Sequence, residues 1–354
     1  MKFLKYIFFL LLIVIIVGAL YFGTKDGTYE VAESKIMDAP ASVIYDNVKD
    51  YKNWQNWGPW MTVDPDINIT YAEKTEGEGA TYSWTSDNME VGNGSMETLK
   101  VIPNKEIEQK ITFNTPIGDS KSDVFWKFEP VEGTPSQTKV TWGMKGEQSL
   151  LEKVFMTFQD EDLETSISTM YQEGLSNLEK DVKDEMQRFE ITVDGITKYG
   201  GGYYLYATTA ARIQDVGMKM GQLMNEVTSF MTQNNIAMSG PTFTVYNQID
   251  EGNGTAIFST GAPVREKIET PNGSPVISGY MEPVTTIKVI LKGDYKNLQE
   301  AYTKGANFII KNGYTPHPTA KMFEVYATNP KEVPNPSNWI TEIYLPILEI
   351  ETPQ

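Results

Sequence analysis

The sequence contains no cysteine and only one histidine, His317. The absence of cysteine excludes disulfides, thiolate metal sites, cysteine nucleophiles and anchoring through a lipid-modified cysteine. His317 lies between Pro316 and Pro318, in a sequence typical of a surface loop, so a Ser-His-Asp triad would depend on this one residue. We therefore expect no catalytic part for His317, and we predict neither a metal site nor a bound cofactor.

Positive charge is scarce as well. The chain carries 30 Lys and Arg against 47 Asp and Glu, which gives a formal net charge of −17. Because phosphate binding needs clustered basic residues, we predict no nucleic-acid partner. Hydrophobic residues make up 40% of the chain and aromatic residues 12%, which is enough for packed cores. A length of 354 residues then favours two folded domains.

The longest apolar run lies at the N-terminus, where Lys2 and Lys5 precede an uncharged stretch from Tyr6 to Phe22. It is long enough for a transmembrane helix, which needs roughly 17–25 residues, and longer than the ~7–15-residue core of a cleaved signal. The basic start predicts a cytoplasmic N-terminus. We predict a membrane anchor over residues 1–26 that crosses the cell membrane once through residues 3–22, with the bulk of the chain outside the cytoplasm. The alternative is a cleaved signal peptide.

Residues 27–190 are predicted to form the first soluble domain. Asp38 is expected to cap a short helix with Pro40 in its first turn, and a second short helix follows Asp50. Apolar residues at helical spacing predict a long final helix over about 163–186. Alternating segments between turn residues predict strands at 29–36, 67–73, 79–85, 91–102, 106–114, 121–129 and 137–145.

Several short motifs of this segment occur together in one known superfamily. They are Ile36-x-x-Ala39-Pro40-Ala41-x-Val43, Trp54-x-x-Trp57-Gly58-Pro59-Trp60, Gly77-x-Gly79, Lys139-Val140-Thr141-Trp142 and Gly174-Leu175-x-x-Leu178. The segment resembles the SRPBCC superfamily, the START-like or polyketide-cyclase/dehydrase group. The resemblance implies a helix-grip fold with an apolar cavity between the sheet and the last helix. Six tryptophans would then be divided between cavity wall and core: Trp54, Trp57, Trp60, Trp84, Trp126 and Trp142.

Residues 191–354 are predicted to form the second domain, after a glycine-rich break over 190–203 that ends in Gly200-Gly201-Gly202. The segment shows an internal repeat of strand, helix, strand and strand. The first copy is expected at 203–209, 213–234, 243–248 and 255–260, and the second at 284–291, 294–310, 320–327 and 339–348.

The last two expected strands carry the most informative pattern of the chain. Read with a period of two, Phe323, Val325, Ile343 and Leu345 share one face of the strand pair, and Glu324, Tyr326, Glu342 and Tyr344 share the other. A sheltered face of carboxylates and phenols suits a cationic or polarisable ligand. From periodicity alone, an ordinary strand pair with one solvated face is the alternative.

Four motifs of this segment occur together in one known family. They are Val245-Tyr246, Gly293-x-Tyr295, Phe323-Glu324-Val325-Tyr326 and Trp339-x-Thr341-Glu342-Ile343-Tyr344-Leu345-Pro346. With these motifs the segment resembles the GyrI-like small-molecule-binding domain. This domain is also the effector-binding part of AraC-type and multidrug-responsive transcription regulators of bacteria. The resemblance implies an aromatic groove around a buried glutamate that takes lipophilic cations. Glu324 matches that glutamate, and the other matching ligand-binding positions are Glu342, Tyr246, Tyr326 and Tyr344. Trp339 would be a packing or rim residue.

The predicted fold class is thus α+β: an N-terminal transmembrane helix, a helix-grip (SRPBCC) domain and a duplicated strand-helix-strand-strand (GyrI-like) domain. In this chain a predicted membrane anchor takes the place of the DNA-binding domain that usually accompanies the family. We therefore apply only the ligand-binding part of the family's role to this chain, and not transcriptional control. We interpret the chain as a sensor, carrier or sequestering protein for a small hydrophobic or cationic molecule. One alternative is a GyrI-like hydrolase in which Glu324 or Glu342 acts with Tyr246 or Tyr326. Another is an envelope structural or interaction protein without a ligand.

Overall fold

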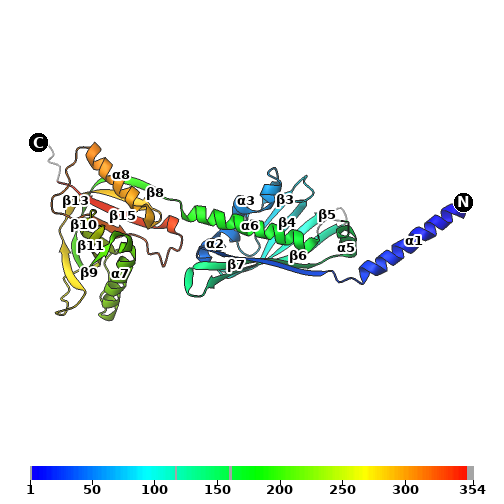
Figure 1. Ribbon diagram of the computed structural model, residues 1–354, viewed down its shortest axis with the longest axis horizontal. Helices are drawn as coiled ribbons and strands as arrows, with labels where there is room; N and C mark the ends of the chain where they lie inside the picture. Colours follow the sequence, from blue (N-terminus) through cyan, green and yellow to red (C-terminus); the bar gives the residue numbers. More distant parts are fainter. Residues whose placement is uncertain (1, 116–117, 159–161, 349–354) are drawn as a thin grey trace. The chain divides into compact units, whose positions relative to one another are not determined.

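The computed structural model describes residues 2–115, 118–158 and 162–348. The chain divides into two compact units, Met1–Glu185 and Met186–Gln354 (Figure 1). Each unit combines helices with one antiparallel sheet, so the predicted α+β class is confirmed.

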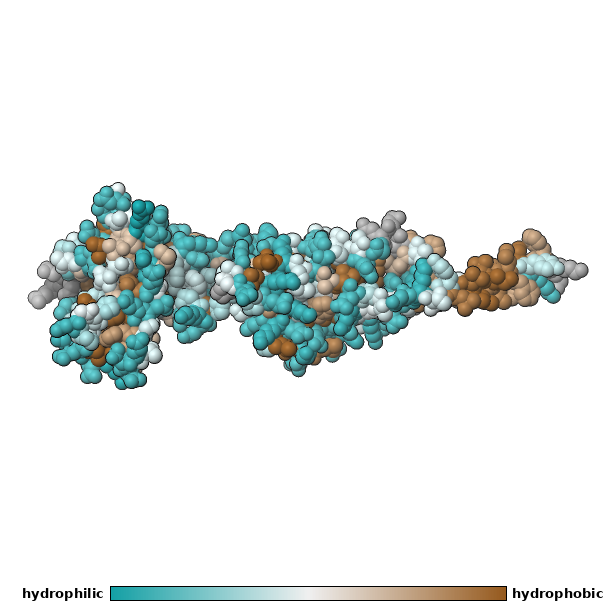
Figure 2. All heavy atoms as spheres, turned by 60° about the horizontal axis from the view of Figure 1, so that its bottom comes forward, coloured by the Kyte–Doolittle hydropathy of each residue, from teal (hydrophilic) through white to brown (hydrophobic). Residues whose placement is uncertain are grey.

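The N-terminal helix α1 (Lys2–Gly23) presents apolar side chains along its length (Figure 2). Within it, Phe3–Gly23 has 21 residues, of which an 18-residue window reaches a mean hydropathy of 2.8 with no residue of that window buried. Its length and composition suffice to cross a membrane, as predicted. A signal sequence has the same properties, so retention of α1 as an anchor stays a prediction.

The first unit is built on a seven-stranded sheet in the order β1-β7-β6-β5-β4-β3-β2. Its strands are β1 (Thr28–Met37), β2 (Asn68–Tyr71), β3 (Thr81–Thr85), β4 (Asn93–Ile102), β5 (Glu106–Thr115), β6 (Gly118–Val131) and β7 (Thr134–Glu147). Its helices are α2 (Ala41–Lys49), η1 (Tyr51–Asn53), α3 (Trp54–Trp57), α4 (Trp60–Val63), α5 (Leu150–Met156) and α6 (Leu163–Met186). All seven predicted strands and the long last helix are present, whereas α5 was not predicted.

One detail of the first unit differs from the prediction. Helix α2 begins at Ala41 with Pro40 as its N-cap residue, and no side chain caps it. The carboxylate of Asp38 instead accepts a hydrogen bond from the Gln137 side chain. Asp38 lies two positions before the N-cap, from where a short side chain does not reach the first free N–H groups of the helix.

The interior of the first unit is filled by aromatic rings. Trp54, Trp57, Trp126 and Trp142 are each at most 1% exposed. Trp142 stacks between Trp126, at a centroid distance of 4.4 Å, and Tyr171 of α6, at 3.9 Å. A Cβ atom on Gly174 of α6 would lie only 2.6 Å from the Trp142 ring. These four tryptophans therefore belong to the core, where the resemblance allowed some of them to line a cavity.

The second unit contains an eight-stranded sheet in the order β12-β9-β11-β10-β14-β15-β13-β8, with two helices on one face. The strands are β8 (Glu190–Tyr199), β9 (Gly202–Arg212), β10 (Phe243–Asp250), β11 (Thr255–Pro263), β12 (Ile277–Met281), β13 (Val284–Lys292), β14 (Phe323–Tyr326) and β15 (Ile340–Pro346). The helices are η2 (Ile213–Asp215), α7 (Val216–Gln233), η3 (Tyr295–Asn297), α8 (Leu298–Lys311) and η4 (Pro336–Asn338). Both predicted copies of the repeat are present.

The predicted glycine-rich break over 190–203 is wrong for most of its length. Glu190–Tyr199 is strand β8, which pairs with β13 at one edge of the sheet. Gly195 has a positive φ of 93°, and the register with β13 shifts beside it. This bulge interrupts the apolar alternation of the strand, which is why periodicity did not reveal it.

A boundary between the domains near residue 190 stays a prediction, and it has a direct test. We expect fragments 25–187 and 188–354 each to unfold cooperatively, because each contains one complete sheet and its helices. A fragment that starts at residue 200 lacks β8, whose Ile191 and Val193 pack on the α8 core. It should be less stable than fragment 188–354 by at least about 2 kcal/mol, since burying one such side chain is worth roughly 1.5–3 kcal/mol. Denaturant titrations measure both expectations, and a non-cooperative melt of fragment 188–354 would contradict the boundary.

Candidate functional site

A cavity of about 1650 Å³ opens in the second unit between the helices and the middle strands of the sheet. Methionines of α7, including Met220 and Met224, form part of its wall. The side chain of Tyr302 on α8 and those of Tyr246, Glu324 and Tyr326 on β10 and β14 also line it. A large cavity with apolar walls and a few convergent polar groups is the usual form of a small-molecule site.

The register of β14 and β15 decides which candidate residues share this cavity. Glu324 pairs with Ile343, and Phe323 pairs with Tyr344. Residues directly opposite each other in an antiparallel pair project to the same side of the sheet. Glu324 and Tyr326 therefore lie on the helix-covered face, and Glu342 and Tyr344 lie on the other. The prediction that all four share one face is wrong.

Glu342 and Tyr344 have partners of their own on the opposite face. Lys288 of β13 lies 2.7 Å from a Glu342 carboxylate oxygen, and the Tyr344 hydroxyl donates to the other oxygen at 2.6 Å. The Tyr344 ring stacks on Phe323 at a centroid distance of 4.8 Å. Glu342 thus has a cationic partner already, and neither Glu342 nor Tyr344 lines the cavity. Glu342 therefore cannot share a proton or a ligand with Glu324, which lies on the other face of the sheet.

Glu324 is completely buried and accepts three hydrogen bonds from phenol groups. Tyr302 and Tyr246 donate to its Oε1 atom at 2.7 and 3.1 Å, and Tyr326 donates to Oε2 at 2.7 Å. The Tyr326 hydroxyl also lies 2.8 Å from Met220 Sδ. No Lys or Arg of the described residues forms an ion pair with Glu324. The carboxylate is therefore held by neutral donors.

The internal repeat explains why two of these tyrosines meet one glutamate. Strands β10 and β14 are antiparallel neighbours, and Thr244 pairs directly with Glu324. Each strand carries a tyrosine two residues further on, Tyr246 and Tyr326. Because residues two apart share a face, both phenols lie on the helix side of the sheet. In the first copy Thr244 bonds the hydroxyl of Thr260 at 3.0 Å, so only the second copy places a carboxylate at the centre.

The third phenol, Tyr302, was missed by the sequence analysis. It lies on α8, four residues after Leu298 and next to the buried Ala301. One face of α8 follows the helical period through Leu298, Tyr302, Gly305 and Ile309. A tyrosine on this otherwise apolar face was the signal from which the sequence could have indicated Tyr302. A buried tyrosine hydroxyl requires a partner, and here the partner is Glu324.

The environment of Glu324 opposes its ionisation. Burial raises the pKa of its carboxyl, while hydrogen bonds from Tyr326, Tyr302 and Tyr246 lower that pKa to a smaller extent. Burial and the adjacent carboxylate raise the pKa of each of the three phenols, so the tyrosines stay protonated and act as donors. The net effect is a carboxyl that ionises less readily than an exposed glutamate.

Two further residues discussed from the sequence, Trp339 and His317, lie around this site. Trp339 packs on Tyr295 at a centroid distance of 4.8 Å, and Tyr295 in turn contacts Tyr326 at 5.7 Å. His317 lines the cavity, where its Nδ1 atom accepts hydrogen bonds from the backbone N–H groups of Thr319 and Ala320. His317 therefore closes a turn at the cavity wall.

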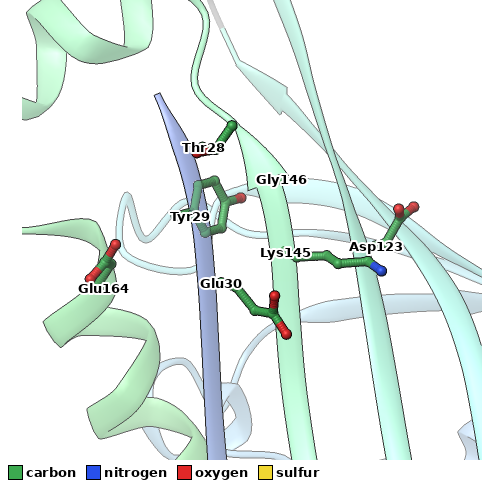
Figure 3. A pocket seen from close by; sticks show the side chains of 7 residues that line it. All are labelled: Thr28, Tyr29, Glu30, Asp123, Lys145, Gly146 and Glu164. Atoms are coloured by element: carbon green, nitrogen blue, oxygen red, sulfur yellow. The ribbon is translucent and has the colours of Figure 1, made fainter. Parts of the chain in front are cut away.

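The first unit has a smaller hollow of about 460 Å³ beside the start of β1. Figure 3 shows Glu30, Lys145 and Asp123 on the neighbouring strands β1, β7 and β6, with Glu164 on α6 beside them. The hydroxyl of Tyr29 is already hydrogen-bonded to Ser122 at 2.6 Å. The hollow is open and its charged side chains are largely exposed to solvent, so we assign no ligand to it. No cluster of three or more metal-ligating side chains occurs among the residues described.

Comparison with known families agrees with both resemblances found in the sequence. Residues 28–183 match the family described as polyketide cyclase / dehydrase and lipid transport. Residues 203–348 match the family described as the GyrI-like small molecule binding domain. Glu324 and its three tyrosines lie within the residues that match the small-molecule-binding family. A search of curated protein sequences gives no match.

Solved structures with similar folds cover single parts of the chain. The C-terminal domain of EcmrR is 16% identical, with a TM-score of 0.37, and the match covers 46% of this chain and 99% of that domain. The Aha1 dimer from Colwellia psychrerythraea is 18% identical, with a TM-score of 0.31, and the match covers 44% of this chain and 96% of that one.

Proposed function

We propose that the protein is a membrane-anchored binding protein whose second unit takes lipophilic cations into the cavity at Glu324. The observation that carries this proposal is a fully buried carboxylate, in a cavity of about 1650 Å³, with three phenol donors and no cationic side chain paired to it among the described residues. Burying a carboxylate is costly unless an opposite charge or a proton accompanies it. A cationic ligand supplies that charge.

The rest of the cavity wall favours the same ligand class. Met220 and Met224 offer flexible, polarisable surface, which adapts to apolar groups of different shapes. Each aromatic ring that faces a bound cation can add roughly 0.5–2 kcal/mol of cation–π attraction. Apolar ligand groups would therefore be held by the helices, and the positive charge by Glu324.

The geometry favours binding over the hydrolase alternative. All three tyrosines donate to Glu324, and the pKa of each is raised, so none is poised to accept a proton near neutral pH. The proposal is tested by equilibrium binding of a lipophilic cation such as tetraphenylphosphonium to the full chain and to its Glu324→Gln variant. Absence of saturable binding to the unmodified chain would refute it.

Anchoring through α1 is the second part of the proposal. We expect the full-length protein in the membrane fraction after a carbonate wash, since Phe3–Gly23 is long and apolar enough to cross a membrane and Lys5 is its only charged residue. Protease added outside the cytoplasm should digest both folded units. N-terminal sequencing decides between anchor and signal peptide: a soluble product that begins near residue 24 would show cleavage.

A further inference from the structure

The short helix α5 and the turn after it expose several large apolar side chains close together, which is uncommon on a protein surface in contact with water. Leu151 and Phe155 on α5 are each 53% exposed, and Phe158, one helical turn further, is 82% exposed. Their spacing of four and then three residues places them on one side of the turn. The Phe158 N–H bonds the Phe155 carbonyl at 3.0 Å, which continues the helical path beyond α5. Three large apolar side chains thus form one face, which we call the α5 face (Leu151, Phe155 and Phe158).

Hydrogen bonds tie α5 to the segment that follows α1. The Lys153 ammonium on α5 donates to the Lys25 carbonyl at 2.6 Å. The Gln148 N–H, just before α5, donates to the Gly27 carbonyl at 2.9 Å. Helix α1 ends at Gly23, and the two residues from there to Lys25 span at most ~7 Å. The α5 helix therefore lies within a short distance of the point where α1 ends.

The end of α1 has the composition of a membrane interface. Tyr21 and Phe22 stand at the last turn, and the Lys25 ammonium lies 4.5 Å and 5.5 Å from their ring centroids. Aromatic rings and basic side chains concentrate at the headgroup level of transmembrane helices. When α1 spans a bilayer, Lys25 is therefore at the headgroups, and Lys153 of α5 is hydrogen-bonded to it there.

We propose that the α5 face inserts into the same bilayer that α1 crosses and so holds the first unit against the membrane surface. The inference rests on the proposed anchoring of α1. Lipid is the occupant that the surroundings favour, because the face is apolar, Lys25 and Lys153 suit anionic headgroups, and the tether places the face at the interface. Without this contact, the first unit would be held to the membrane only through the short segment after α1.

The absence of cysteine makes the proposal directly testable. Phe155→Cys introduces a single thiol for an environment-sensitive fluorophore, in the full-length protein reconstituted in vesicles of phosphatidylethanolamine and phosphatidylglycerol. Ile36→Cys is the matched control, because Ile36 is 56% exposed and lies eight residues along β1 from Thr28, about 26 Å away. We expect a blue-shifted emission at position 155 that nitroxide-labelled lipids quench at least twofold more than at position 36.

The possible outcomes separate the proposal from its premise. Equal quenching at positions 155 and 36 in protein that remains in carbonate-washed vesicles would overturn docking and leave anchoring intact. Loss of the protein from the vesicles would overturn both. A blue shift at position 155 that depends on protein density and not on lipid quencher would show that a second copy covers the face. Phe158→Cys, at an even more exposed position, repeats the measurement in case Phe155→Cys folds poorly.

Discussion

Replacing Glu324 with glutamine is expected to weaken binding of a lipophilic cation by about 1.5–3 kcal/mol, the range for hydrogen bonds to a charged group. This corresponds to an increase in Kd of about 10- to 150-fold. Glutamine keeps the size and planarity of the side chain and still accepts from Tyr302 and Tyr246, whereas the negative charge is lost. A neutral ligand of similar size, such as triphenylphosphine oxide, should bind nearly as before. Isothermal titration with both ligands measures the difference.

Glu342→Gln is the matched control for this experiment. It makes the same chemical change on the opposite face of the sheet, where Glu342 is paired with Lys288. Its effect on cation affinity should be within about twofold, which corresponds to about 0.4 kcal/mol. If both variants lost cation affinity equally, or if Glu324→Gln weakened neutral and cationic ligands alike, the electrostatic role of Glu324 would be disproved.

The same two variants give a pH readout. The pKa of Glu324 is raised, so cation affinity should be full above that pKa and should fall as the pH drops through it, beginning at a less acidic pH than for an exposed glutamate. The sign for folding is opposite. A raised folded pKa stabilises the fold below the unfolded pKa, and this contribution disappears as the pH rises through the folded pKa. Both dependences should vanish in Glu324→Gln and persist in Glu342→Gln.

Replacing Trp142 with alanine is expected to lower the free energy of unfolding of the first unit by about 3–5 kcal/mol, the usual cost of deleting a fully buried aromatic side chain. Trp142 is 1% exposed and is enclosed by Trp126, Tyr171 and Gly174. The surrounding structure can fill the resulting cavity only in part, because the neighbours of Trp142 are large rigid rings and the backbone of α6. Denaturant titration followed by tryptophan fluorescence reports this unit, since Trp339 is the one tryptophan of the seven in the second unit.

Trp60→Ala is the control for that measurement. Trp60 belongs to the same cluster but is only partly buried, with its ring 6.3 Å from that of Trp142. Its removal should cost less than half as much. A loss below about 1 kcal/mol for Trp142→Ala would instead show that the interior tolerates an empty volume, as a ligand cavity does.

The overall organisation could be predicted from local signals. A long apolar run located α1, and apolar periodicity located α6 and both copies of the repeat. The alternation within 323–326 correctly put Glu324 and Tyr326 on one face. Such signals are strong because a side chain's direction depends on its own strand or helix. Strand β8 was not predicted, because the bulge at Gly195 breaks the alternation of its apolar residues.

The sequence by itself determined the absences and the elements: no thiol chemistry, an apolar N-terminal helix, two α+β segments, and a glutamate with a tyrosine two residues away. Only the tertiary structure decided which groups meet. The pairing register of β14 with β15 places Glu342 on the opposite face of the sheet from Glu324. A shift of that register by one residue would move every side chain of the strand to the other face. The packing of α8 on the sheet brought Tyr302 to Glu324. Pairing offsets and helix positions depend on contacts between distant segments, which no local period encodes.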